Sequence, residues 1–102
     1  MKIEIGDQVF ELEYTINAVC DLEELTGKNL GDVLATQGMS SVRALLWCGL
    51  TEHMKGLTMK QAGNLLQEYM KGHTMEELVE VLGKAIEQAG FIQAQQGKPK
   101  AK

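Results

Sequence analysis

The segment SSVRALLWCGLTEHMKGLTMKQAGNLL, residues 40–66, brings a thiol and an imidazole close together in the sequence, at Cys48 and His53. A thiol with an imidazole as its base is used in nucleophilic catalysis, and both groups are also zinc ligands. On a helix, however, side chains five residues apart point to different faces. The chain holds two Cys and two His in total, without the close pairs typical of structural zinc sites. We therefore predict neither a catalytic cysteine nor a metal site.

Two further groups of residues have types that could do chemistry. The pair Gly27-Lys28 matches the end of a phosphate-binding loop, but the glycine five residues earlier is missing and an asparagine replaces the following hydroxyl. Asp21, Glu23 and Glu24 could supply an acid–base pair, but they fall away from the apolar stripe of their segment and suit a solvated surface. We predict a protein that is not an enzyme and needs no cofactor.

The N-terminal residues that would support any site alternate between apolar and polar side chains. This period of two is typical of strands with one buried face, and the residues Gly6-Asp7-Gln8 between the two runs suit a turn. A β-hairpin is therefore predicted, with an apolar face that the rest of the chain must cover. The apolar residues of this face are Ile3, Ile5, Phe10, Leu12 and Tyr14.

The rest of the chain is predicted to be helical, because capping residues and glycines bound several amphipathic segments. The predicted N-terminal caps are Thr15, Ser40 or Ser41, Thr58 and Thr74. The glycines expected to end these helices are Gly27, Gly56, Gly72 and Gly90. The segment NLGDVLAT adds a short helix of at most two turns. Leu25 and Val79 belong to the predicted apolar stripes.

These elements predict an α+β fold, with an N-terminal β-hairpin followed by four to five amphipathic helices. Residues 1–92 are expected to form a single domain, the usual number for a chain of 102 residues. Residues 93–102 hold three lysines and no large apolar side chain, which predicts a disordered basic tail. Both cysteines are expected to be buried, reduced thiols. The predicted core leucines are Leu45, Leu46, Leu65 and Leu82.

The charge of the chain bears on its partners and location. A net charge of -4 argues against general attraction to nucleic acid, because such binding depends on Lys and Arg neutralising phosphates. The sequence contains no long uncharged apolar run of the kind that a membrane-spanning helix or a signal peptide needs. We expect a cytoplasmic protein with no membrane or nucleic-acid partner.

A helix-turn-helix DNA-binding regulator is the alternative that we keep. Residues 57–86 contain two capped segments of suitable length, joined near a glycine. The second helix would have to enter the major groove. It carries four glutamates and one lysine, which would bring carboxylates toward phosphates, so this alternative is the less favoured one.

Methionines are concentrated in the middle of the chain, since five of the six lie between Met39 and Met75. Methionine adapts its shape and recurs on surfaces that accept irregular apolar partners, although it also fills gaps in cores. Trp47 lies beside the apolar face of its helix, so we expect it to be half-exposed, with buried edge packing as the alternative. The candidate partner-binding residues are Trp47, Met54 and Met59.

The order of these segments resembles the small tail assembly chaperones of long-tailed bacteriophages and gene transfer agents. The resemblance covers about residues 1–90, from MKIEIGDQVFELEY through INAVCDLEELTGKNLGDVLA, VRALLWCGL and LTMKQAGNLL to MEELVEVLGKAI. Its most telling parts are LEELTGKNL, RALLWCGL and the threonine-capped helix that follows. These are packing and capping patterns, and none of them is a catalytic signature.

This resemblance implies a non-enzymatic protein of the infected or lysogenic host cytoplasm that is absent from the mature virion. Such chaperones hold the long tape measure protein while tail tube subunits polymerise around it, so the implied partners are the tape measure protein and the tail tube protein. In many members a ribosomal frameshift adds a C-terminal extension, and the segment GKPKAK is where one would branch. The resemblance assigns no functional residue and leaves self-association open.

Overall fold

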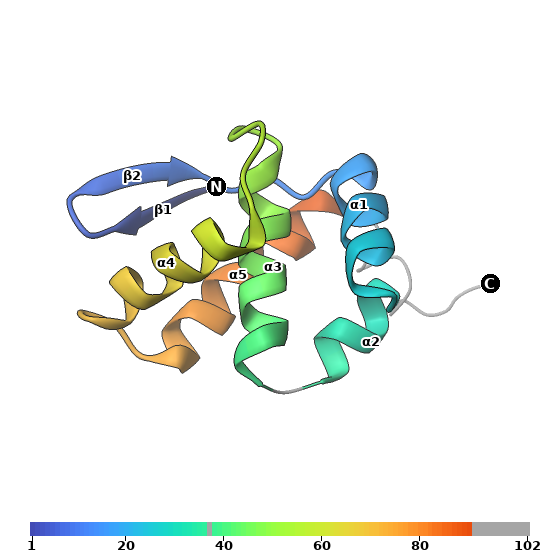
Figure 1. The fold of residues 1–102 in the computed structure, drawn as a ribbon. Coiled ribbons are helices and arrows are strands. Elements are labelled where there is room, and N and C mark those ends of the chain that lie inside the picture. Colours follow the sequence, from blue (N-terminus) through green and yellow to red (C-terminus); the bar gives the residue numbers. More distant parts are fainter. Residues whose placement is uncertain (37, 91–102) are drawn as a thin grey trace.

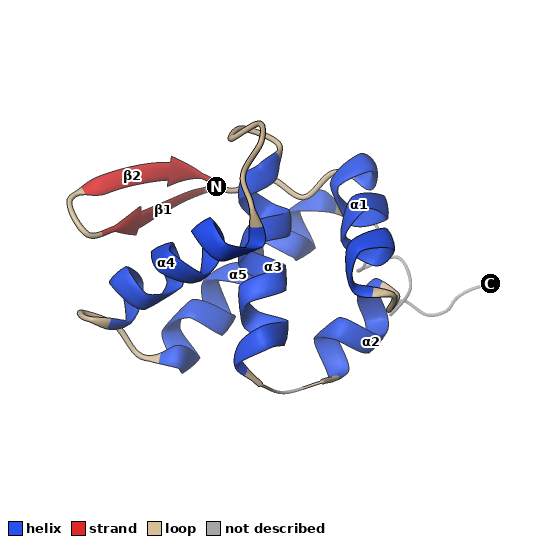
Figure 2. Ribbon diagram, in the orientation of Figure 1, coloured by secondary structure: helices blue, strands red, loops and turns tan. Residues whose placement is uncertain are grey.

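The computed structural model describes residues 1–36 and 38–90. An antiparallel hairpin of two strands is followed by five helices, which confirms the predicted α+β fold (Figures 1 and 2). The strands are β1 (Lys2–Ile5) and β2 (Gln8–Glu11), and the helices are α1 (Ile16–Thr26), α2 (Leu30–Ala35), α3 (Met39–Thr51), α4 (Met59–Met70) and α5 (Met75–Ala89). The predicted disordered tail, residues 93–102, lies outside the described residues.

The hairpin has a two-residue turn, one residue shorter than predicted. Gln8 pairs with Ile5, so Gly6 and Asp7 alone connect the strands, and Gly6 takes a positive φ of 65°. Ile3 and Ile5 are buried, and β1 contacts α4. The helical part of the chain therefore covers the apolar face of the hairpin, as a two-stranded sheet requires.

Helix α3 lies at the centre of the molecule. It contacts β2 and the other four helices, with the hairpin and α4 on one side and α1 and α2 on the other (Figure 1). Every residue from Ala44 to Leu50 is buried, which is typical of a helix that is apolar all round. Leu45, Leu46 and Leu82 are buried as predicted.

Most predicted caps are confirmed. The Thr15 side chain accepts a hydrogen bond from the Ala18 amide at the start of α1. Thr58 and Thr74 each form a capping box, in which the side chain three residues later bonds back to the backbone of the threonine. Gly27 and Gly90 follow α1 and α5 in the left-handed conformation.

The predicted boundaries of α3 are wrong at both ends. The helix begins at Met39 after Gly38, so neither Ser40 nor Ser41 caps it, and Ser41 is buried within its first turn. It ends at Thr51, five residues before Gly56. The capping preference of the two serines is overridden here, because the packing of α3 at the centre of the molecule determines which residues become helical.

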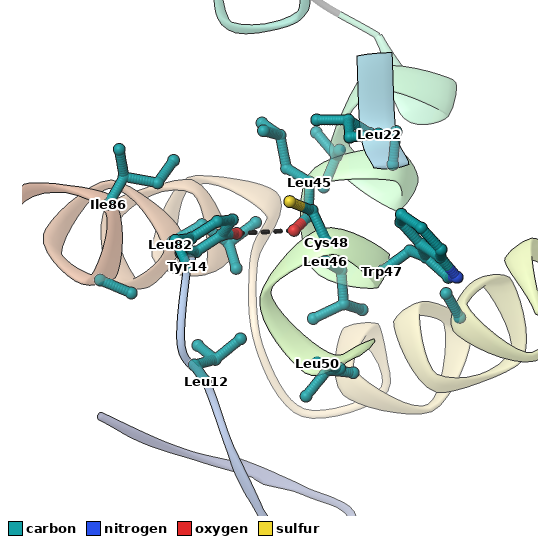
Figure 3. Close-up of a cluster of buried hydrophobic side chains, with 14 of the residues drawn as sticks. Leu12, Tyr14, Leu22, Leu45, Leu46, Trp47, Cys48, Leu50, Leu82 and Ile86 are labelled. Carbon is teal, nitrogen blue, oxygen red and sulfur yellow. Dashed lines mark hydrogen bonds between the residues drawn. The ribbon is translucent and has the colours of Figure 1, made fainter. Parts of the chain in front are cut away.

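The chain between β2 and α1 packs directly onto α3. Figure 3 shows the Tyr14 ring reaching into the space between α3 and α5, where its hydroxyl donates a hydrogen bond of 2.6 Å to the Leu45 carbonyl oxygen. The Glu13 amide donates to the Gly49 carbonyl oxygen at 2.8 Å. These contacts fix the hairpin relative to the central helix.

Glycine at position 49 permits this close approach. A Cβ atom there would lie 2.7 Å from Leu12 Cδ2 and 2.9 Å from Tyr14 Cζ. We expect Gly49→Ala to lower the free energy of unfolding by about 1–3 kcal/mol, because the overpacking exceeds the gain in helix propensity.

The matched control is Gly83→Ala in α5, where a Cβ would meet no atom within 4 Å. This change should raise stability by up to about 1 kcal/mol, because alanine is the better helix former. Urea denaturation followed by circular dichroism measures both effects. Equal shifts of the two midpoints would contradict the close contact at Gly49.

Candidate partner-binding surfaces

The thiol and imidazole noted in the sequence do not meet in the fold. Cys48 is completely buried in the core, and this burial, with a smaller contribution from the charge of Asp21, raises the pKa of its thiol to about 12. A thiol in this state is protonated and inaccessible, unlike a nucleophile. His53 lies on the surface, where its Nε2 is 2.7 Å from Glu13 Oε1. The two side chains therefore lie apart, with Cys48 packed in the core and His53 paired with Glu13 on the surface.

The acidic residues of α1 are surface groups, and one of them supports the neighbouring helix. Asp21 and Glu24 are exposed, whereas Glu23 Oε2 accepts a hydrogen bond of 3.0 Å from the Leu30 amide at the start of α2. Cys20 is also exposed, so the prediction that both thiols are buried is wrong for this residue. Within residues 1–36 and 38–90, no three His, Cys, Asp or Glu side chains are grouped so that they could hold a metal ion.

Trp47 is buried, and the expectation that it is half-exposed is wrong. Its side chain is only 8% exposed, and the indole N–H donates a hydrogen bond of 2.7 Å to the Leu57 carbonyl oxygen. The structure therefore shows the alternative prediction for Trp47, in which its side chain packs at the edge of the core. Met54 and Met59 are half-buried against the core. Because α3 is covered on all sides, a position beside its apolar face is still internal.

A first groove lies between the hairpin turn and α4, with a volume of about 690 Å³. Its apolar lining includes Phe10, Met54, Leu57 and Leu65, and its polar lining includes Asp7, Gln61 and Glu68. Leu65 is half-buried there, so the prediction that it is a core residue is wrong. Of the three predicted partner-binding residues, Met54 lines this groove.

A second groove, which we call the α2–α5 groove, lies between α2, the start of α3 and α5, with a volume of about 1040 Å³. Buried side chains such as Val42, Leu82 and Ile86 form its floor. Leu34, Met39 and Val79 also line it, and they are 39%, 59% and 50% exposed. Six large apolar side chains are exposed in the described part of the chain, and these are three of them.

The α2–α5 groove is acidic at its α5 side. Glu76, Glu77 and Glu80 line it, and among residues 1–36 and 38–90 no Lys, Arg or His contributes to its lining. The pKa of Glu77 is lowered, first by the hydrogen bond from the Thr74 backbone amide and then by His73, whose Nδ1 is 3.3 Å away. This carboxylate therefore remains charged at neutral pH, so the groove combines apolar walls with negative charge.

No sequence motif indicates this groove directly. Leu25 and Val79 are predicted in buried stripes, but they are 57% and 50% exposed, so the prediction is wrong for both. The stripe on α5 is wider than its contact with α3 requires, and Val79 falls on its exposed part. The wide stripe was the available signal. Its residues are Met75, Leu78, Val79, Leu82, Ala85 and Ile86.

No helix among the described residues is both long enough and apolar enough to cross a membrane. Comparisons of the chain with protein-family models, with curated proteins and with solved structures found no match.

Proposed function

We propose that this protein is a non-enzymatic tail assembly chaperone that binds apolar helical segments of a phage tape measure protein, in the host cytoplasm, while tail tube subunits assemble. The observation that carries the proposal is the α2–α5 groove, where Leu34, Met39 and Val79 are exposed around one concave surface. The resemblance of residues 1–90 to tail assembly chaperones supplies the class of partner. The mature virion is not expected to contain the protein.

The physical basis of this binding is apolar burial. Single exposed apolar side chains are normal on protein surfaces, but several around one groove are typical of an interaction site. A groove between helices can accept the apolar face of another helix, which is a common mode of peptide recognition. Met39 and Met75 add adaptable walls, which suit a chaperone that must bind many segments of a long helical protein.

The proposed surface differs from the one expected from sequence. Trp47 is left out of it, because its indole is buried and its N–H already has a partner. Met54 belongs to the groove beside the hairpin, on the opposite side of α3 from α2. Met59, at the start of α4, does not line either groove.

The DNA-binding alternative gains no support from the position of α5. The apolar face of this helix is packed in the core through Leu78, Leu82 and Ile86, and Glu76, Glu80 and Glu87 are exposed. An exposed face of this charge would be repelled by the phosphates that flank a major groove.

The test is co-expression with the tape measure protein encoded in the same genome, followed by pull-down at about 0.05 M and about 1 M salt. We expect a complex at both concentrations, because apolar association is not weakened by the screening that weakens exposed charge pairs. Val79→Ser should weaken the complex at least about tenfold, which corresponds to losing roughly 1.4 kcal/mol of apolar contact.

The control is Val9→Ser, which changes a valine that is slightly more exposed than Val79 but lies on the hairpin. This variant should retain the complex. Failure to recover the tape measure protein at either salt concentration would rule out the proposed function. Retention of duplex DNA that falls steeply as salt rises would favour the regulator instead.

A further inference from the structure

We infer that the α2–α5 groove binds about three turns of an amphipathic helix whose apolar stripe is flanked by Lys or Arg side chains. This inference rests on the proposed function only in taking the partner to be helical. It specifies the length, the register and the charge of the segment that the groove selects.

The length follows from the extent of the groove along α5. Its lining runs from Thr74 to Ile86 on this helix. At 1.5 Å per residue, this stretch is about 18 Å long, which matches about three turns of a helix lying beside it.

The register follows from the residues of α5 that face the groove. Met75, Val79, Leu82 and Ile86 all line it, and their spacing alternates between four and three residues. This spacing forms the apolar seam by which two helices pack side by side at a small crossing angle. Leu78 and Ala85, which are absent from the lining, are buried on the other side of that seam. Leu82 and Ile86 are buried at the floor of the groove, so the half-buried Met75 and the exposed Val79 are the part of this seam that a helix from outside the domain can contact.

The residue at position 83 favours close approach of that helix. Gly83 lines the groove on the side of the seam away from the core, and a Cβ built there would meet no atom within 4 Å. Small residues at helix interfaces allow backbones to come close together. A bulky apolar side chain of the partner has room beside this glycine.

The charge follows from the carboxylates on the same side as Gly83. Glu76 and Glu80 lie one helical turn apart on α5 and flank the seam, and Glu77 adds a third carboxylate to the lining. Charged residues that flank an apolar seam select partners of the opposite sign. A second copy of this chain whose α5 packed parallel to this one would place the three glutamates against the same three, and such like-charge contacts are destabilising. A helix with Lys or Arg beside its apolar stripe fits instead.

Two synthetic peptides of about 14 residues test this inference, with the same leucine seam and with either lysine or glutamate at the flanking positions. Calorimetric titration into the full chain at low salt should give at least about tenfold tighter binding of the lysine peptide, from several charge pairs that change sign. Raising the salt should reduce this preference, while the apolar part of the binding persists.

The variant that reports on the charge is Glu76→Lys/Glu80→Lys, which should reverse the preference between the peptides. Its control is Glu87→Lys, because Glu87 is exposed on the same helix but does not line the groove. The control should keep the preference for the lysine peptide. Circular dichroism confirms that the variants are folded.

The inference would be overturned if the two peptides bound with equal affinity or if neither bound. It would also be overturned if Glu87→Lys reversed the preference as Glu76→Lys/Glu80→Lys does. Concentration-dependent dimerisation of the free chain that Val79→Ser abolishes would assign the groove to a second copy and would overturn it as well. Recovery of the tape measure protein without peptide binding would leave the proposed function standing and this inference wrong. Selective binding of the lysine peptide without a tape measure complex would support this inference and show that the proposed function is wrong.

Discussion

Replacing Leu46 with alanine should lower the free energy of unfolding by about 2–5 kcal/mol. Leu46 has no exposed surface and lies in the middle of α3, the helix that contacts every other helix (Figure 3). Removing its side chain loses the transfer free energy of the deleted groups and leaves a cavity that the neighbours only partly fill. Because domains of this size have a total stability of about 5–15 kcal/mol, the variant should be close to unfolding at 37 °C.

Urea denaturation of Leu46→Ala and Leu65→Ala provides the comparison. Leu65 is half-buried in the groove between the hairpin turn and α4, so its truncation leaves a space that water can enter instead of a closed cavity. The loss of unfolding free energy should therefore be smaller for Leu65→Ala. Equal losses for the two variants would show that the packing around α3 is not what determines stability.

The second large effect is expected at alkaline pH. The pKa of Cys48 is raised from its ordinary value of 9 to about 12 by burial, and burial also raises the pKa of Tyr14. Since the folded protein resists ionisation of these groups, their contribution to stability is complete below pH 9 and is lost as the pH rises toward 12. One pH unit corresponds to about 1.4 kcal/mol for one such group, so Cys48 alone should cost about 4 kcal/mol by pH 12.

Denaturant midpoints measured from pH 7 to pH 11 check this expectation. Cys48→Ala should lower stability at pH 7, because it opens a small cavity, but it should flatten the decline above pH 9. Cys20→Ala is the control, because this thiol lies on the surface and its removal should leave the decline in place. A decline of the same steepness in all three proteins would show that Cys48 is not its source.

The parts of the fold that sequence predicts well are those that local chemistry decides. A capping box needs only a hydroxyl residue and a Glu or Gln three positions later, and the two such patterns at Thr58 and Thr74 begin α4 and α5. The hairpin follows from period-two alternation and a glycine turn. These signals act over a few residues, and at these positions tertiary contacts leave them unchanged, unlike at Ser40 and Ser41.

The wrong predictions share a physical cause, which is that burial depends on neighbours distant in sequence. Trp47 is internal because both sides of α3 are covered, and Leu65 is half-buried because it lines the groove between the hairpin turn and α4. Cys20 follows the buried Val19 in α1, but within the described part of the chain its side chain is exposed. The pattern of a single helix does not contain this information.

The candidate site could not be predicted from sequence for the same reason. An apolar stripe has the same sequence pattern whether it faces the core or a partner, so Val79 could not be told from Leu82 before the helices were placed. In the sequence, the acidic residues beside Val79 argue only against DNA binding and do not indicate a groove. Only the juxtaposition of α5 with α2 shows that these carboxylates border an apolar groove.

The central position of α3 also determines how its amide protons exchange with solvent. A helix in contact with β2 and with four other helices cannot open without disrupting all of them, so its amides should exchange only through unfolding of the whole domain. Helix α2 has six residues, forms one wall of the α2–α5 groove and, among the described elements, contacts only α1 and α3 extensively, so we expect it to open more readily than α3. Deuterium uptake in α3 would therefore report the global free energy of unfolding, while uptake in α2 would report the local freedom with which the groove adjusts to a partner.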